Sequence, residues 1–268
     1  MLRLALLLLF LGVATSQAAP DGHCMALKDT GGCRQGKVTD SDRVLLPGVH
    51  VYFSAPTRRY RHGVFGDEIE WGELTYVRQG SAAHGPYIYE KITLPKSRVF
   101  EDLAPRLIDL DGDGNSEIVL IETHVNKGAQ LAVYDLVDQK LQKIASTPHI
   151  GRTHRWLAPI GAADLDGDGY VELAYIDRPH LAKLLKIWRY KDGKLKLVAE
   201  AGNLTNHQFG DDYISGGIRD CGNGPEMVTA NANWSEIMIS RFDGTKITAQ
   251  KAGTYTGLKS INRAMRCR

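Results

Sequence analysis

The sequence has no excess of charge of either sign and, beyond its first residues, no long hydrophobic run. It contains 33 Lys and Arg against 31 Asp and Glu, a formal net charge of +2 over 268 residues. A chain this close to neutrality has no field that would attract nucleic acid or an anionic membrane, so we expect no nucleic-acid partner. No segment after residue 13 approaches the ~20 apolar residues of a membrane-spanning helix, so we expect no membrane span.

Common catalytic motifs are also missing. The sequence has no Gly-x-Ser-x-Gly nucleophile elbow, no His-Glu-x-x-His zinc motif and no glycine-rich phosphate loop. These absences weaken an enzymatic interpretation without excluding one, and they give no catalytic residue to name. The apolar share of 43% and the charged share of 24% are ordinary for a folded domain and exclude a disordered or collagenous chain.

The one long apolar run lies at the N-terminus. Arg3 precedes the apolar residues 4–13, and the small and polar stretch 14–19 follows them. This order is typical of a secretory signal peptide, and it fits a buried N-terminal helix less well. We expect cleavage after Ala18 and a secreted or periplasmic mature protein, in which residues 19–42 form a Cys-containing N-terminal segment.

Cysteine is scarce, but its number is even. Four cysteines in an exported chain are more often paired than free, and three pairings are possible. Cys24 and Cys33 bracket a short segment, which favours a local bridge and leaves Cys221 to pair with Cys267. A Cys24–Cys267 bridge would instead clasp the two termini together.

An internal repeat is the most informative feature of the sequence. The pattern Asp-Leu-Asp-Gly-Asp-Gly-x-x-Glu occurs at residues 109–117 and again at residues 164–172, and an apolar run follows each copy. A third copy at residues 218–228 has a shorter loop and has lost most of its carboxylates. Further apolar stretches follow each copy, and Asp-Gly pairs at 192–193 and 243–244 predict tight hairpin turns.

The repeat predicts the fold. Each unit contains four short predicted strands in about 55 residues, which is the size of one propeller blade. We therefore expect an all-β domain over residues 43–268, a small β-propeller of four or five four-stranded blades with Ca-binding loops. A β-sandwich also uses many short strands, but the long-period repeat favours the propeller.

The acidic loops carry the clearest chemistry. Three Asp residues alternate with small residues, so a curled loop can turn its carboxylates inward, and a Glu closes the ring. The expected metal ligands are Asp109, Asp111, Asp113, the carbonyl of Asn115 and Glu117 in the first loop, and Asp164, Asp166, Asp168, the carbonyl of Tyr170 and Glu172 in the second. Such hard oxygen ligands suit Ca²⁺ better than zinc or copper.

The sequence disfavours two alternatives to this calcium site. An EF-hand needs a Glu at loop position twelve, where this sequence has Leu120 and Tyr175, and it needs a following helix in place of a strand. A metal-free acidic hairpin is the other alternative, and repulsion among its carboxylates disfavours it.

With these loops, the chain resembles the FG-GAP or VCBS repeat proteins, which are relatives of the integrin α-subunit propellers. Ile160-Gly161 before Asp164, and Tyr170 inside the loop, also fit that pattern. The resemblance covers residues 60 to 250 and is most specific at the two loops. It implies a β-propeller with Ca²⁺ on loops at its outer edge, serving as a scaffold that binds proteins or other ligands, and it does not imply catalysis.

Three histidines are weaker candidates for ligand binding. His124 and His180 follow corresponding strands of successive units, so they could lie near one another around the ring, together with His62. Ordinary loop histidines are the alternative. The leading functional hypothesis is a calcium-stabilised propeller that binds a protein or a glycan. The alternative is a Ca-dependent hydrolase with a site in the central channel, which an inner cluster of carboxylate and histidine groups would favour.

Overall fold

The computed structural model describes residues 25–26, 33–34, 44–46, 48–79 and 87–268. The expected signal peptide and the expected Cys24–Cys33 bridge lie outside the residues whose side chains it describes. The described chain consists of antiparallel β-sheets and one short helix, α1 (Leu258–Met265), so the all-β prediction is confirmed. No helix in this part of the chain is long and apolar enough to cross a membrane.

Four antiparallel units follow one another along the chain. The first contains β3 (Val44–Leu46), β4 (Val49–Thr57), β5 (Glu70–Arg78) and β6 (Ile88–Thr93). The second contains β8 (Arg106–Ile108), β9 (Glu117–His124), β10 (Gly128–Val137) and β11 (Lys140–Ser146). The third contains β12 (Leu157–Ala163), β13 (Glu172–Asp177), β14 (Leu184–Lys191) and β15 (Lys194–Ala201). The fourth contains β17 (Gly217–Asp220), β18 (Pro225–Asn231), β19 (Glu236–Phe242) and β20 (Ile247–Thr254).

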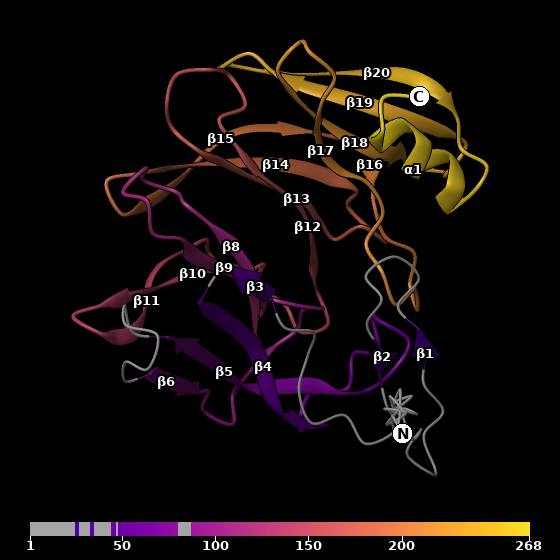
Figure 1. The fold of residues 1–268 in the computed structure, drawn as a ribbon. Coiled ribbons are helices and arrows are strands. Elements are labelled where there is room, and N and C mark those ends of the chain that lie inside the picture. The colour runs from indigo at the N-terminus through magenta and orange to yellow at the C-terminus, as the bar shows by residue number, and fades with distance from the viewer. Residues whose placement is uncertain (1–24, 27–32, 35–43, 47, 80–86) are drawn as a thin grey trace, which may run out of the picture.

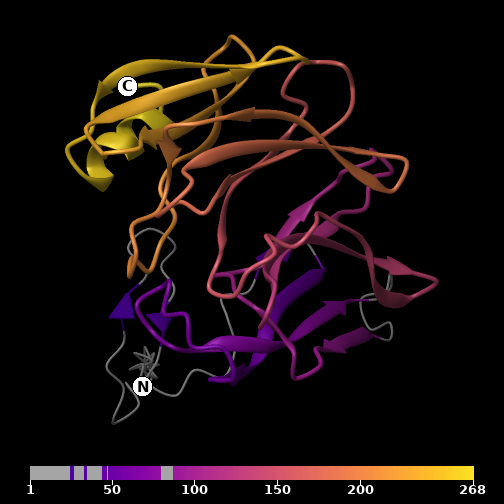
Figure 2. The ribbon, with the colours of Figure 1, turned by 180° about the vertical axis from the view of Figure 1, so that it is seen from behind.

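Four short strands lie outside these units. Strand β7 (Arg98–Phe100) pairs with both β5 and β9, so it joins the first and second units. Strand β16 (Leu204–Thr205) pairs with β18, and β1 (Met25–Ala26) pairs with β2 (Cys33–Arg34). The units are arranged in an arc, with the first at one end and the fourth at the other (Figure 1, Figure 2). This succession is propeller-like, and the number of blades stays a prediction.

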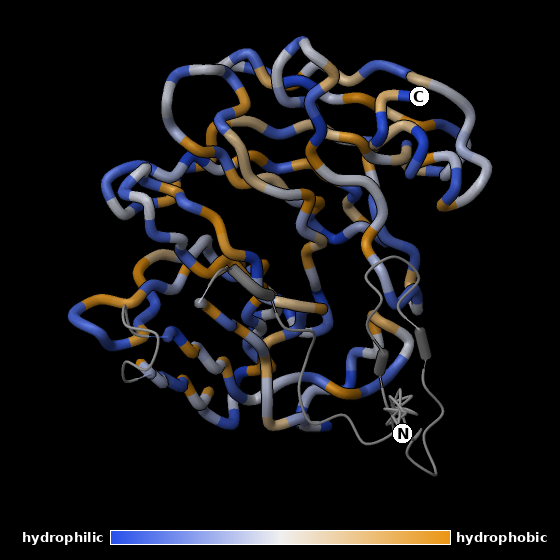
Figure 3. The backbone as a smooth tube through the Cα atoms, in the orientation of Figure 1, coloured by the Kyte–Doolittle hydropathy of each residue, from blue (hydrophilic) through white to orange (hydrophobic). Residues whose placement is uncertain are grey.

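Alternating side chains on the strands hold neighbouring units together. Ile118 and Leu120 of β9 pack toward the first unit, whereas Val119 and Ile121 pack toward the third. The alternation follows from the pleat, which points successive side chains to opposite faces of a sheet. A fully buried aliphatic side chain contributes roughly 1.5–3 kcal/mol. Hydrophobic stretches accordingly follow the strands, and hydrophilic residues gather at the connections (Figure 3).

A helix that the sequence analysis did not predict covers the fourth unit. Ile261 and Ala264 of α1 are buried against Val228 and Ile237 of β18 and β19. A terminal unit needs a cover for its apolar face, and here the helix supplies it in place of another sheet. The disulfide between Cys221 and Cys267, with Cα atoms 5.8 Å apart, ties the end of the helix segment to the fourth unit. This is the pairing expected from the sequence.

Two loops from distant parts of the chain meet between the first and the fourth units. The amide of Gly210 donates to the carbonyl of Val64 at 2.9 Å. A Cβ on Gly66, whose φ is +88°, would come within 2.7 Å of the Gly210 carbonyl oxygen, so this close approach requires glycine. The Phe65 ring packs edge-on against Trp156 with ring centroids 5.0 Å apart. The first and fourth units are therefore joined through these loops.

Candidate functional site

The acidic loops and the histidines occupy opposite ends of the strands. In the third unit Ala163 pairs with Glu172 next to the acidic loop, whereas Leu157 pairs with Asp177 at the other end of the hairpin. The connection that leaves β13 carries His180, so it lies at the end remote from the acidic loop.

The first acidic loop, residues 109–117, curls around its own first aspartate. Asp109 accepts hydrogen bonds from the amides of Gly112 at 2.8 Å and Gly114 at 3.1 Å. Both glycines have positive φ, +78° and +87°, which the curl requires. Carboxylate oxygens of Asp109, Asp111 and Glu117 lie within 4.8 Å of one another, so this loop fits a hard cation.

The remaining expected carboxylate of the first loop, that of Asp113, does not lie with the other three. Asp113 accepts the amide of Asn115 at 2.7 Å and its side-chain nitrogen at 3.1 Å, and it lies outside the cluster of three carboxylates. These hydrogen bonds lower the pKa of Asp113. The structure therefore brings together three of the predicted carboxylates and uses the fourth to hold the turn.

Glu117 is the buried member of the first loop. One of its oxygens accepts the Leu110 amide at 2.7 Å, and no group in the described part of the chain hydrogen-bonds to the other. The pKa of Glu117 is raised to about 7, chiefly by burial; the charges of Asp111 and Asp135 add to the rise, and the Leu110 hydrogen bond opposes it. Within the described residues, Glu117 thus lies in an anionic loop and forms no ion pair.

The second acidic loop, residues 164–172, repeats the curl. Asp164 accepts the amides of Gly167 at 2.8 Å and Gly169 at 2.9 Å, and Glu172 accepts the Leu165 amide at 2.8 Å. Oxygens of Asp164, Asp166 and Glu172 again lie within 4.8 Å of one another. The backbone of the two loops is therefore alike.

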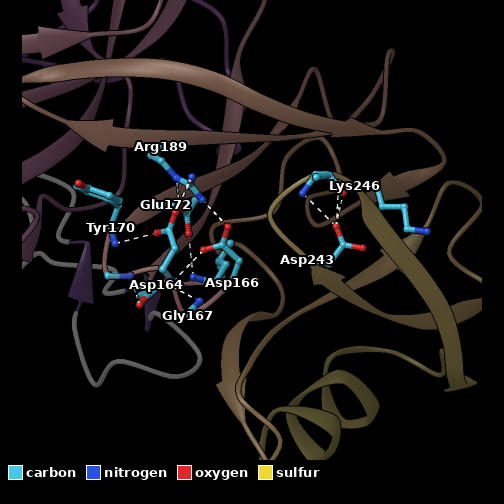
Figure 4. Close-up of polar contacts among 12 residues, drawn as sticks. Asp164, Asp166, Gly167, Tyr170, Glu172, Arg189, Asp243 and Lys246 are labelled. Atoms are coloured by element: carbon cyan, nitrogen blue, oxygen red, sulfur yellow. Dashed lines mark hydrogen bonds and ion pairs between the residues drawn. The ribbon is translucent and has the colours of Figure 1, made fainter.

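A protein cation distinguishes the second loop from the first. The Arg189 guanidinium, on β14, contacts Asp166 at 2.5 Å, Asp168 at 2.7 Å and Glu172 at 2.6 Å (Figure 4). Burial raises the pKa of Glu172, and the hydrogen bond and charge of Arg189 oppose that rise. Three carboxylates expected as metal ligands are thus already paired with a positive group.

The fourth unit lies against the second loop. A Cβ on Gly244, in the turn between β19 and β20, would come within 2.9 Å of an Asp166 oxygen. The neighbouring Asp243 accepts the amides of Thr245 and Lys246, which fixes the turn (Figure 4). Asp166 is half-buried as a result, whereas the corresponding Asp111 of the first loop is exposed.

The sequence analysis missed Arg189, although a signal for it exists. Arg189 is the strand partner of Glu172, the residue that closes the loop. In the second unit the corresponding residue is Asp135, which follows Tyr134, the strand partner of Ile118. In the fourth unit it is Arg241, which follows Ser240, the strand partner of Met227. In the fourth unit, Glu226 is held between Arg241 and Arg219. An alignment of the three units at this position would have revealed the difference.

At the other end of the strands, the structure brings two of the three predicted histidines to one cavity. His62 and His180 line a cavity of about 230 Å³ together with His154. His124 lies apart, beside His149 with ring centroids 5.8 Å apart. His154 had no distinguishing sequence pattern, because its neighbours in space come from other units.

Hydrogen bonds fix the orientation of these imidazoles. His62 Nδ1 donates to the buried Glu101 at 2.5 Å, and the Thr123 hydroxyl donates to the same carboxylate at 2.6 Å. His207 Nε2 lies 3.0 Å from the Asp211 carbonyl, which can only accept, so this nitrogen carries the proton. His207 Nδ1 then accepts from His180 Nε2 at 3.0 Å.

Burial keeps the linked pair of histidines uncharged. It is the main reason that the pKa of His207 is lowered to about 3 and that of His180 to about 4, and the charge of His62 contributes to the lower pKa of His180. Neutral His180, which lines the cavity and has its proton on Nε2, has Nδ1 as a hydrogen-bond acceptor.

Comparison with known proteins agrees with the geometry of the loops. The family model of the FG-GAP-like repeat matches residues 109–175, a segment that contains both acidic loops. The chain therefore carries an FG-GAP-like repeat, as the resemblance implied. No curated protein matches the chain. Among solved structures it is similar to the exotype rhamnogalacturonan lyase YesX, with 14% identity over 86% of this chain and 51% of that one and a TM-score of 0.43. The chain thus spans about half the length of that protein, and we base no argument on this likeness.

Proposed function

We propose that this protein is a calcium-stabilised, secreted or periplasmic β-propeller module that binds a protein or a glycan and does not catalyse a reaction. The observation that carries the proposal is the first acidic loop. Within the described residues, no Lys or Arg forms an ion pair with the clustered carboxylates of Asp109, Asp111 and Glu117, and Ca²⁺ is the cation that such ligands suit. Bound Ca²⁺ would neutralise the loop and fix the connection between β8 and β9.

The second loop supports a weaker site. Its donor set is the same in chemistry, but Arg189 already pairs with Asp166, Asp168 and Glu172. A calcium ion would have to displace the guanidinium or share the carboxylates with it. We therefore expect one tight and one weak calcium site, in place of the two equal sites that the sequence predicts.

Export fits the same proposal. The order of charge, apolar run and small residues at the N-terminus is typical of a secreted chain, and the Cys221–Cys267 disulfide is typical of an oxidising compartment. N-terminal sequencing of the mature protein after expression in an exporting host tests this part. A mature chain that begins at Ala19 would support the predicted cleavage site.

One observation favours the hydrolase as a second candidate. The buried carboxylate of Glu101 orients His62 at the cavity, and a histidine held in this way is a common general base. Among the residues that the structure describes, His62 makes no hydrogen bond to a side chain that could act as a nucleophile. The acidic loops lie at the other end of the strands, so calcium there would act on stability and not on a reaction at the cavity.

Calorimetry tests the calcium proposal, and a substrate screen separates the binding module from the hydrolase. The melting temperature with Ca²⁺ should exceed that with a chelator, and equal values would refute the calcium proposal. A screen of the Ca²⁺-loaded protein against ester, phosphoester and glycoside substrates should show no turnover. Turnover that is lost in His62→Gln, with an unchanged melting temperature, would establish the hydrolase instead.

A further inference from the structure

The histidine cavity has the size and rim of a site for a single ring. Its volume of about 230 Å³ lies below the ~300–1,000 Å³ of pockets for drug-sized ligands. Trp156 is among the lining residues and is buried, whereas Phe209 and Leu181 are 60% and 61% exposed. Exposed apolar side chains grouped at a cavity mark an interaction site more often than scattered ones do.

Phe209 offers a flat surface between two histidines. Its ring meets His62 and His180 edge to face, with centroids 6.0 and 5.4 Å apart. These contacts hold the ring at the cavity while most of its surface remains open to solvent. The open surface suits a ligand with a flat apolar face.

The polar groups at the cavity differ in what they offer. His180 presents Nδ1 as an acceptor, because its Nε2 proton is committed to His207. A ligand hydroxyl would satisfy this nitrogen. A carboxylate would not, since it has no proton to donate.

The charge at the cavity is positive. Arg155 donates only to the His154 carbonyl, at 2.7 Å, and has no carboxylate partner within the described ranges. The nearby carboxylates are already paired, Glu101 with His62 and Asp177 with Arg178. Arg155 is therefore an available partner for an anionic group, and charge-assisted hydrogen bonds to guanidinium are among the stronger ones.

We propose that this cavity binds an acidic sugar, a uronic acid residue, with its ring against Phe209, a hydroxyl on His180 Nδ1 and its carboxylate on Arg155. The three requirements are a flat apolar face, a hydroxyl donor and an anion, and a pyranose uronate meets all of them. A neutral sugar lacks the anion, and an aromatic carboxylate such as benzoate lacks the hydroxyl. The inference rests on the proposed binding function and names its ligand class.

Titration calorimetry of the full mature protein with Ca²⁺ tests the inference. The ligands are D-galacturonate and D-glucuronate, with D-galactose, D-glucose and benzoate as comparisons. At least one uronate should bind about tenfold more tightly than its neutral counterpart, a difference of about 1.4 kcal/mol, because hydrogen bonds between a carboxylate and the Arg155 guanidinium are charge-assisted. Binding of neither uronate, or equal binding of acid and neutral sugar, would overturn the inference, and preferential binding of benzoate would identify a site for aromatic carboxylates instead.

Variants assign the binding to the cavity. Arg155→Ala should abolish the preference for the acid, and Phe209→Ala should weaken binding of the acid and the neutral sugar alike. Arg152→Ala and Tyr89→Ala are matched controls, since both side chains are exposed and neither lines the cavity. Uronate binding that survives Arg155→Ala and Phe209→Ala unchanged would place the site elsewhere and refute the inference.

The outcome is separable from that of the proposed function. If Ca²⁺ raises the melting temperature and no uronate binds, this inference fails while the calcium-stabilised module stands. If a uronate-containing oligosaccharide binds and is also cleaved, the ligand class stands and the non-catalytic proposal fails.

Discussion

The acidic loops at residues 109–117 and 164–172 have the same curl but differ in how their negative charge is balanced. In the first loop, the position opposite the closing Glu117 is occupied by Asp135, which adds a further negative charge. In the second, the position opposite Glu172 is Arg189, whose guanidinium pairs with three carboxylates. One residue on a neighbouring strand can therefore decide how strongly a loop depends on a metal ion.

The fourth unit extends the comparison. Its shorter loop keeps Asp220 but lacks the other two aspartates, and Glu226 is held by Arg219 and Arg241. Across the second, third and fourth units, the closing glutamate thus faces an aspartate, then one arginine, then two. The demand for an external cation falls in the same order, because a guanidinium near a carboxylate favours its charged form.

The largest expected effect is the removal of calcium. At a thousandfold excess over Kd, a single site adds about 4 kcal/mol to stability, and a chelator removes that contribution. Asp111→Asn should abolish most of the Ca²⁺-dependent rise in melting temperature, whereas the matched Asp166→Asn should abolish little of it. Equal losses in the two variants would contradict the asymmetry between the loops.

Arg189→Gln should act in opposite directions with and without the metal. In a chelator it leaves the buried Glu172 without its cation, so we expect a loss of about 2–3 kcal/mol, somewhat less than for breaking a fully buried pair. With Ca²⁺ the vacated carboxylates should bind a second ion tightly, which isothermal titration would record as a doubled stoichiometry of tight sites. Lys191→Gln is the control. Lys191 is on the same strand as Arg189, β14, but its ammonium lies over the Tyr170 ring.

The two loops can be compared only at a pH at which the histidines near the cavity do not themselves destabilise the fold. His207 and His180 have folded-state pKa values lowered to about 3 and about 4, so their contribution to stability is complete above the unfolded pKa of about 6.5. It is lost progressively as the pH falls below that value, by up to about 1.4 kcal/mol per pH unit for each histidine. The raised pKa of Glu117 changes stability in the opposite direction over this range, equally in the parent protein and in histidine variants. Urea denaturation at pH 7.5 and 5.5 should therefore show this loss when the parent protein is compared with such variants. His207→Gln and His180→Gln should each reduce it, and an undiminished loss in both variants would refute the assignment.

The sequence was sufficient for features that local patterns determine. The aspartates and glycines of each loop lie within a few residues of one another, so their spacing alone predicts the curl around Asp109 and Asp164. The repeat likewise predicts the strands on either side, because each unit has the same order of apolar runs and turns. The helix α1 escaped prediction, since its role is to cover a face that only the folded fourth unit presents.

Features that depend on pairing between distant residues could not be predicted in this way. Arg189 meets Glu172 through the register of β13 and β14, and a shift by one residue would have placed it on the other face. His62 and His180 come together through loops from the first and third units, while His154 and His207 carry no local pattern that marks them. Arg189 determines the charge balance of the second acidic loop, and the histidines line the cavity or orient the groups that line it.

The smallest expected effect comes from converting the first loop to the second type. Asp135→Arg would place a guanidinium opposite Glu117, and Asp135 is half-buried with only a local hydrogen bond to the Leu136 amide, so the strand should tolerate it. In a chelator, we expect a gain of about 1 kcal/mol, typical of a partly exposed ion pair, together with weaker Ca²⁺ binding at the first loop. Asp135→Asn removes the negative charge without adding a cation, and it should give a smaller change in the same direction. If Asp135→Arg left both the chelated stability and the Ca²⁺ affinity unchanged, the residue opposite the closing glutamate would not be what separates the two loops. The difference would then have to come from the fourth-unit turn that covers Asp166.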